Sequence, residues 1–342
     1  MIYFKIQKKM TEKNNNSLIY ICHKGKSQFA FPILNFLSQK IKLYRSESKY
    51  GFIHKIRLKN NKIIWVEWAR KQAKYISNCI NNDQKLIIRL HRYEMEDYNT
   101  LSQINWEKVS RVIFVNSEVE KKFKLLFPKV NTIMIPNAIE TTLFKINNLN
   151  SDNSLLAYGQ HYNPIKAYDK LIIMFANIIK KNSNFTLTIA GQEPTQKKHQ
   201  EYFDHCNELI KKYDLTQNVT LLKLINGKKE QNNLTKILYL LQNHNAIVSF
   251  SEIESFHYAF AEGLLSGLQG FCRGWRELNP NEFWRDWCYI NENEMIKEIL
   301  QWGQKSEYER KIIGEENRNY IIKNFSSEAI GEKYLHLISN LQ

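Results

Sequence analysis

The sequence predicts an α/β protein made of two doubly wound domains, each with a parallel sheet covered by helices on both faces. Short apolar runs alternate with segments of helical periodicity along most of the chain. Such alternation is typical of parallel sheets with crossover helices. The length of 342 residues is enough for two domains of ordinary size, and an asparagine-rich run at 147–153 marks a linker between them.

In the first half, the expected strands are short and rich in β-branched residues, and the expected helices carry an apolar stripe. The strands are expected at 18–22, 62–66, 86–90, 111–115 and 132–135, and the helices at 29–39, 70–80 and 118–127. The second half repeats the pattern. Its strands are expected at 155–158, 185–190, 219–222 and 246–250, and its helices at 166–181, 196–213, 230–243 and 256–266.

These patterns predict a first domain over 1–146, a second over 154–325, and a C-terminal helix over 326–342 that packs back on the first domain. Ligands of such domains bind beyond the carboxyl ends of the strands, so we expect the site in a cleft between the two domains. Five scattered cysteines without a close pair argue against disulfides and for a reducing compartment. No signal peptide or membrane span is visible, and the protein is expected to be cytoplasmic.

Charge is distributed unevenly along the chain. Residues 1–150 hold 27 Lys and Arg against 11 Asp and Glu, a balance of +16, whereas residues 151–342 hold 22 against 23, a balance of −1. The first half is therefore expected to meet an anionic surface, such as the cytoplasmic face of a membrane, or an acidic acceptor. Nucleic acid is not the predicted partner, because no RNA- or DNA-binding motif accompanies the basic residues. These residues cluster with aromatic side chains at Lys55, Arg57, Lys59, Lys62, Arg70, Lys71 and Lys74.

Two glutamates, Glu254 and Glu262, are the most informative residues of the second half. They follow the expected strand 246–250 and lie eight positions apart. Glu262 falls in the expected helix 256–266, and Glu254 lies just before it. Eight helical steps cover about 12 Å, close to the distance between the hexose and the ribose of a nucleotide sugar. A carboxylate accepts hydroxyl hydrogen bonds well, and a helix N-terminus between the two would suit a diphosphate. The alternative is a pair of solvated helix glutamates.

The segment 251–267 resembles the donor-site signature of retaining GT-B glycosyltransferases of family four. Ser255 and His257 replace the two glycines of that signature. Tyr158-Gly159-Gln160, followed by Lys166-Ala167, resembles the phosphate-binding stretch of the same family, with Gln160 in the place of an arginine. The Pro136–Glu140 linker, the strand and turn at Gly191, and the terminal segments 316–318 and 324–326 are similar as well.

The resemblance implies a GT-B transferase that moves a sugar from a nucleoside-diphosphate sugar to a glycan or lipid-linked acceptor, in the synthesis of a bacterial surface polysaccharide such as capsule, O-antigen or a teichoic-type polymer. His91, at the end of an expected strand, resembles the family's strand-end histidine. The implied catalytic residues are His91, Glu254 and Lys166. The implied donor-binding residues are Gly159, Gln160, Lys166, Gly191, Glu254, Ser255, Phe256, His257 and Glu262, and the candidate acceptor residues are His23, Lys24, Glu67, Arg89 and Arg92.

The sequence predicts no metal site and no cofactor, because it lacks an Asp-x-Asp motif after a strand. Two other hypotheses stay open. An inverting GT-B transferase would use Glu67 or a neighbour as a base. A degenerate GT-B scaffold would bind a nucleotide sugar or a polymer without transfer, which the replacements Gln160 and Ala167 make worth testing.

Overall fold

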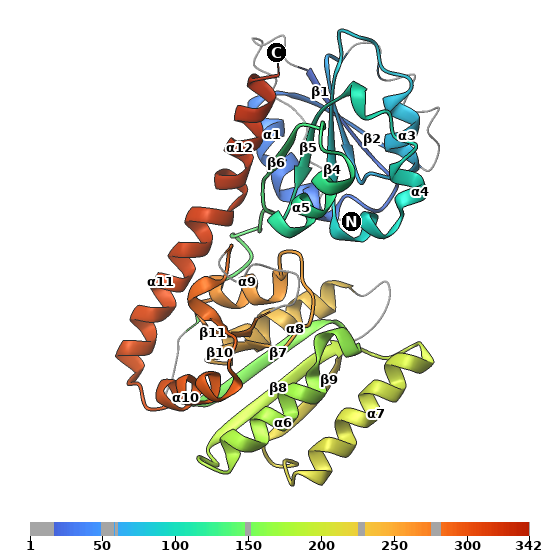
Figure 1. Ribbon diagram of the computed structural model, residues 1–342. Helices are drawn as coiled ribbons and strands as arrows, with labels where there is room; N and C mark the ends of the chain where they lie inside the picture. The colour runs from blue at the N-terminus through green and yellow to red at the C-terminus, as the bar shows by residue number, and fades with distance from the viewer. Residues whose placement is uncertain are drawn as a thin grey trace. The chain divides into compact units, whose positions relative to one another are not determined.

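The computed structural model describes residues 17–48, 58, 61–147, 152–224, 230–274 and 282–341. The chain divides into two compact units, each built on one six-stranded sheet (Figure 1). Unit 1 comprises Met1–Phe114, Phe127–Ile133 and Lys333–Gln342, and unit 2 comprises Val115–Leu126 and Met134–Glu332.

The sheet of unit 1 has the strand order β2-β1-β3-β4-β5-β6. The bounds are β1 Ser17–Cys22, β2 Lys42–Glu47, β3 Ile63–Glu67, β4 Lys85–Leu90, β5 Val109–Phe114 and β6 Thr132–Met134. The pairs β1/β2, β1/β3, β3/β4 and β4/β5 are parallel. Because the order reverses at β1, the carboxyl ends of β1 and β3 form the switch point where α/β sheets of this kind bind ligands.

Among the described residues of this part of the chain, short helices lie between the strands. They are η1 Gln28–Ala30, α1 Phe31–Lys40, α3 Lys71–Ser77, η2 Arg92–Glu96, α4 Tyr98–Leu101, η3 Trp106–Lys108 and α5 Ser117–Leu126. The last helix, α12 Ser327–Ser339, returns to unit 1 with its C-terminal half. There the buried Tyr334 ring stacks on Trp65 with 4.7 Å between the ring centroids.

The sheet of unit 2 has the order β9-β8-β7-β10-β11-β12, which is the 3-2-1-4-5-6 order of nucleotide-binding domains. The bounds are β7 Asn153–His161, β8 Phe185–Gln192, β9 Val219–Leu224, β10 Ala246–Ser249, β11 Gln269–Arg273 and β12 Cys288–Tyr289. All five neighbouring pairs are parallel. The switch point therefore lies at the carboxyl ends of β7 and β10.

Helices connect these strands and cover the sheet. They are η4 Pro164–Lys166, α6 Tyr168–Ile179, α7 Lys197–Lys212, α8 Glu230–Gln242, α9 Tyr258–Leu265, η5 Arg285–Trp287, α10 Glu292–Trp302 and α11 Glu307–Phe325. Right-handed crossovers place α6 and α7 on one face and α9 on the other, because the chain travels in opposite directions from β7 and from β10.

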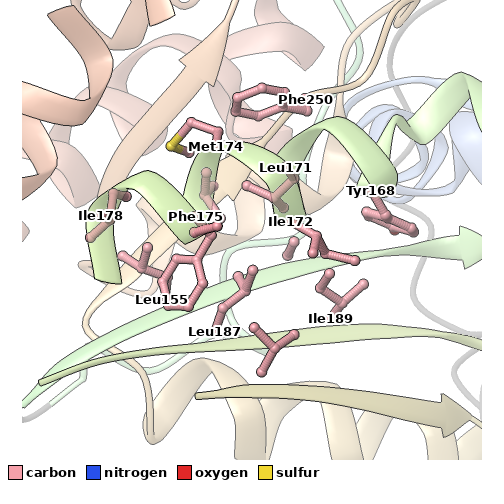
Figure 2. Close-up of a cluster of buried hydrophobic side chains, with 14 of the residues drawn as sticks. Leu155, Tyr168, Leu171, Ile172, Met174, Phe175, Ile178, Leu187, Ile189 and Phe250 are labelled. Atoms are coloured by element: carbon pink, nitrogen blue, oxygen red, sulfur yellow. The ribbon is translucent and has the colours of Figure 1, made fainter. Parts of the chain in front are cut away.

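The core of unit 2 is a continuous layer of apolar side chains between α6 and the sheet. Ile172 and Phe175 of α6 point toward Leu155, Leu187 and Ile189 of β7 and β8, whereas Leu171 lies on the side of Phe250, and all are buried (Figure 2). Their burial fixes the start of α6 over the carboxyl end of β7. The residues that precede α6 are held at the switch point in this way.

The doubly wound α/β architecture predicted from the sequence is confirmed in both units. The strand β2 was not predicted, because it is a largely exposed edge strand with a polar sequence and no alternating pattern. The helices predicted at 166–181 and 256–266 begin two residues later, at Tyr168 and Tyr258. The reason is local: Ala167 and His257 have φ of 46° and 63°, a left-handed conformation that an α-helix excludes.

Candidate functional site

The candidate donor site of unit 2 is centred on Lys166 and Glu254, which follow β7 and β10 at the switch point. Lys166 Nζ donates to Glu254 Oε1 at 2.5 Å. The two side chains are only 21% and 16% exposed. The pair thus links the loop after β7 to the loop after β10, at the place where a ligand of this fold is expected.

Glu254 is held in its ionised form. Burial opposes its ionisation, but the charge that His257 carries when protonated, the charge of Lys166 and the hydrogen bond from Lys166 outweigh it and keep the pKa of Glu254 below its usual value. Burial lowers the pKa of His257 to about 4, so this imidazole is neutral near pH 7. Lys166 is therefore the cation that balances Glu254, and an anionic ligand that attracts Lys166 would release the carboxylate.

Gly159 makes this contact possible. A Cβ atom at position 159 would lie 2.9 Å from the Tyr168 hydroxyl and 3.0 Å from Lys166 Cε. The Lys166 side chain thus crosses directly over the backbone of β7 on its way to Glu254. Any larger residue at 159 would displace the lysine.

His257 occupies the left-handed conformation that favours glycine, and its side chain turns into the site. The ring is 6% exposed, its Nε2 lies 2.6 Å from Ser249 Oγ, and its Nδ1 lies 3.9 Å from Glu254 Oε1. His257 therefore adopts a left-handed conformation that glycine reaches without steric cost. It adds a ring that anchors the loop to the end of β10.

Glu262 lies on α9 and accepts a hydrogen bond from the Tyr158 hydroxyl at the end of β7. Burial raises the pKa of Glu262 to about 7. The predicted helical span of about 12 Å between the two glutamates is wrong, because α9 begins at Tyr258 and Glu254 lies in the loop before it. Both carboxylates nevertheless border the same strand, since Glu254 contacts Lys166 and Glu262 contacts Tyr158.

The remaining predicted donor residues differ in their exposure. Gln160 is exposed at the end of β7, and Ser255 is half-buried before α9. Gly191 lies in β8 against the ring of Tyr162, only 3.0 Å from the position of an added Cβ. Phe256 is 1% exposed within a cluster of aromatic rings, and its carbonyl accepts from Trp284 Nε1 at 3.1 Å. The Phe256 side chain is therefore part of the packing of unit 2 and is not available to a ligand.

Unit 1 contains a second polar cluster, at the carboxyl ends of β3 and β4. Glu67 Oε1 lies 2.8 Å from His91 Nε2 and 3.3 Å from an Arg89 guanidinium nitrogen. The Glu67 and Arg89 side chains are both 0% exposed. Burial lowers the pKa of His91 although the hydrogen bond to Glu67 opposes this. Glu67 and Arg89 lie behind His91, so they could act on a substrate only through it.

Trp68 covers this cluster in a strained backbone conformation. Its φ of 74° is unusual for a bulky residue, and its ring stacks on His91 with 4.1 Å between centroids. The indole N–H donates to the carbonyl of Lys26 at 2.9 Å, which ties β3 to the loop after β1. The strain and the stacking together fix the plane of the His91 ring.

The other candidate acceptor residues lie nearer the surface. Lys24 is exposed and His23 is half-buried in the loop after β1, where His23 Nδ1 contacts the Lys24 carbonyl at 3.1 Å. Arg92 lies on η2 and pairs with Glu96 at 3.2 Å, away from the Glu67 contacts. The structure thus groups Glu67, Arg89 and His91 directly and leaves Arg92 outside this group.

Three contributors to these clusters were not predicted from the sequence. Tyr158 binds Glu262, Ser249 binds His257, and Trp68 stacks on His91. Only their positions at the ends of predicted strands could have indicated them. Within the described ranges, no group of three or more His, Cys, Asp or Glu side chains is placed to hold a metal ion. The helices of the same ranges include none that is long and apolar enough to cross a membrane.

Comparison with known proteins identifies the fold. No protein-family model and no curated protein sequence matches the chain. Among solved structures, the chain is similar to S. aureus TarM, with 19% identity over 84% of this chain and a TM-score of 0.64. It is also similar to Anabaena HepE in complex with UDP and glucose (14% identity, 95% coverage, TM-score 0.67) and to the lipopolysaccharide outer core galactosyltransferase WaaB (11%, 95%, 0.66).

The chain spans 57% of the TarM chain and the full length of the HepE and WaaB chains. At 11–19% identity the likeness is one of fold. These neighbours are GT-B glycosyltransferases, and the two doubly wound units of this chain have the GT-B fold. The predicted fold class is confirmed by this comparison.

Proposed function

We propose that the protein is a glycosyltransferase that takes its sugar from a nucleoside-diphosphate sugar. The observation that carries this proposal is the Lys166–Glu254 pair at the switch point of unit 2, bordered by Glu262. Lys166 supplies a compact positive charge for a diphosphate, and Glu254, once released, accepts hydroxyl hydrogen bonds from a sugar. Glu262 serves the ribose hydroxyls. The GT-B neighbours in complex with UDP support the same class of donor.

The proposed reaction retains the anomeric configuration. The leaving diphosphate oxygen helps to take the proton of the acceptor hydroxyl while the glycosidic bond breaks, so no protein nucleophile is required. Lys166 stabilises the negative charge that grows on the diphosphate. The anomeric configuration of the product decides between this reaction and an inverting one. Glu67 is a poor base for an inverting reaction, because its carboxylate is fully buried.

The first test is a thermal-shift screen with UDP-, GDP-, ADP- and CDP-sugars. A donor at 100 times its dissociation constant should stabilise the protein by about 2.7 kcal/mol. Slow hydrolysis of the stabilising donor in the absence of acceptor identifies an active enzyme. Stabilisation without hydrolysis or transfer, even with a panel of glycan acceptors, would instead indicate the degenerate scaffold.

We further propose that the acceptor is a glycan or a lipid-linked intermediate of a bacterial surface polysaccharide, and that the basic first half attaches the enzyme to the cytoplasmic face of the membrane. Lys62, Lys71 and Lys74 are exposed, whereas Arg70 is engaged with Glu94 at 3.3 Å. Lys55, Arg57 and Lys59 lie outside the described residues. Each basic residue near an anionic surface contributes about 1 kcal/mol.

Co-sedimentation with anionic liposomes tests the membrane proposal. The protein should bind at low salt, detach at high salt and ignore charge-neutral vesicles. A Lys62→Glu/Lys71→Glu variant should bind much less, whereas Lys211→Glu/Lys212→Glu, which changes the same charge on α7 of unit 2, should behave like the wild type. Protein that remains in the supernatant at low salt would make a soluble acidic acceptor the better account of the charge.

A further inference from the structure

Two histidines of unit 2, near the carboxyl end of β7, have no role in the contacts described above. His161 is the last residue of β7, directly after Gln160, and His199 lies in the first turn of α7. Their rings are stacked, with 5.2 Å between centroids and an interplanar angle of 18°. His199 is 6% exposed and His161 is half-buried.

The ring nitrogens of this pair reach solvent, because neither histidine is among the described residues with a fully buried, unpartnered side-chain nitrogen. Among the residues that the structure describes, neither His161 nor His199 makes a hydrogen bond through its ring. Two such rings side by side indicate donors that are kept available for a ligand.

The charges around the pair specify the sign of that ligand. Burial comes first among the causes that lower the pKa of His161, followed by the positive charges of His199, Lys166 and Lys198. Burial and Lys198 likewise lower the pKa of His199. Glu193 follows Gln192, the register partner of His161 on β8, but the charged groups that shift the pKa values of the pair, on η4 and on α7, are cationic. An anion would relieve their mutual repulsion and would favour protonation of both rings.

We propose that His161 and His199, together with Lys166 and Lys198, form a phosphate subsite that provides the positive charge missing at Gln160. The ligand class is a phosphate or diphosphate group. This inference rests on the proposed function for its biological ligand, because a nucleoside-diphosphate donor would bring such a group to the carboxyl end of β7. Gln196 makes no side-chain cap at the start of α7, where the helix dipole favours an anion.

Calorimetric binding of inorganic pyrophosphate tests the subsite without a nucleoside. Binding to the wild type should be tighter at pH 6 than at pH 8 and should take up protons, measured as a heat that depends on the ionisation enthalpy of the buffer. His161→Gln and His199→Gln should each weaken binding at pH 6 about 10-fold, the effect of a lost hydrogen bond to a charged group. Both variants should lose the matching part of the proton uptake.

His205→Gln is the matched control, because His205 lies on the same helix with an exposed side chain. It should bind pyrophosphate like the wild type. Since the buried His199 could be needed for folding, His199→Asn provides a second variant. The amide of asparagine reaches the position of the ring Nδ1 atom, whereas the amide of glutamine reaches the position of the ring Nε2 atom. A thermal unfolding curve for each variant separates lost binding from lost structure.

The outcomes distinguish this inference from the proposed function. Wild-type affinity and proton uptake in folded His161→Gln and His199→Asn would overturn the subsite, even if UDP binds normally. Pyrophosphate binding that depends on both histidines, in a protein that binds none of the nucleotide sugars, would support the subsite and remove the nucleotide-sugar proposal. Absence of pyrophosphate binding by the wild type at either pH would overturn the subsite.

Discussion

Each unit of this protein carries a glutamate that contacts both a cation and a histidine at the carboxyl end of its sheet. In unit 1, Glu67 contacts Arg89 and His91, and both members of the ion pair are 0% exposed. In unit 2, Glu254 contacts Lys166 and lies 3.9 Å from His257, and the ion pair is 16–21% exposed. The two clusters share residue types but differ in access to solvent and in the kind of cation.

This difference determines what each cluster can do. A fully buried pair cannot exchange partners, because the separated charges would remain in a medium of low dielectric. A partly exposed lysine on a flexible stem can leave its carboxylate for an anionic ligand, whereas the planar arginine of unit 1 is fixed in place. We therefore assign ligand exchange to unit 2 and the positioning of His91 to the buried pair of unit 1.

The largest expected effect is on stability, and it tests the contrast directly. Arg89→Leu leaves the Glu67 carboxylate buried without its cation and should lower the free energy of unfolding by about 3–5 kcal/mol. The matched change Lys166→Leu leaves the Glu254 carboxylate with some access to water and should cost less, about 1–3 kcal/mol. Urea unfolding followed by circular dichroism measures both. Equal losses would show that the exposure of the pairs does not matter.

The second prediction concerns catalysis. Lys166→Ala should lower turnover about 10²–10³-fold, as removal of a group that stabilises charge in the transition state does. Its effect on donor affinity should be smaller, because the charge on the diphosphate grows as the bond breaks. His91→Ala should act in the same direction. A folded His91→Ala variant with normal turnover would return His91, and with it the whole cluster of unit 1, to a structural role.

The third prediction separates the two glutamates of unit 2. Glu262→Ala should weaken nucleotide binding by about 1.5–3 kcal/mol, or roughly 10–150-fold, because a charged acceptor of the ribose hydroxyls is lost. Glu254→Ala should impair transfer but leave the binding of free nucleoside diphosphate nearly unchanged. Calorimetry with the nucleoside diphosphate measures both variants. Equal affinity of the wild type and Glu262→Ala would reject the ribose assignment.

The raised pKa of Glu262 also makes the stability of the folded protein depend on pH. The folded state holds the Glu262 proton up to a pKa of about 7, whereas the ordinary pKa of a glutamate is 4.5. The unfolded chain therefore releases the proton first, and stability falls as the pH rises from about 4.5 to about 7. Glu262→Gln should remove this loss and should be more stable than the wild type at pH 8. A wild-type slope that is unchanged in Glu262→Gln would contradict the assigned pKa.

The smallest expected effect concerns the backbone at His257. His257→Gly relieves a left-handed conformation that costs about 1–2 kcal/mol in an L-residue, but it also loses the hydrogen bond to Ser249. The net change in unfolding free energy should stay within about 1 kcal/mol. Asp214→Gly is the control, since Asp214 has φ of 54° and is exposed, and it should stabilise the protein slightly. A gain at 257 as large as at 214 would mean that the ring contributes nothing.

Much of the fold was predictable because buried parallel strands carry strong sequence signals. The strands β3 and β10 are buried throughout and appear as apolar runs, and the helix α6 shows a clear apolar stripe. The edge strand β2 escaped prediction because exposure on both sides removes that signal. The helix starts at Tyr168 and Tyr258 were placed two residues too early, since nothing in the sequence marks Ala167 and His257 as left-handed.

The sequence by itself determined the two doubly wound units and the residue types available at their strand ends. The pattern of buried residues depends on local composition, and the strand order is limited by right-handed crossovers. Only the tertiary structure decided which of these residues meet. The contacts of Lys166 with Glu254 and of Tyr158 with Glu262 join residues 88 and 104 positions apart in sequence. Such contacts depend on the register of neighbouring strands and on the space left by Gly159. The burial that shifts the pKa values of Glu262 and His257 arises only when these elements pack together.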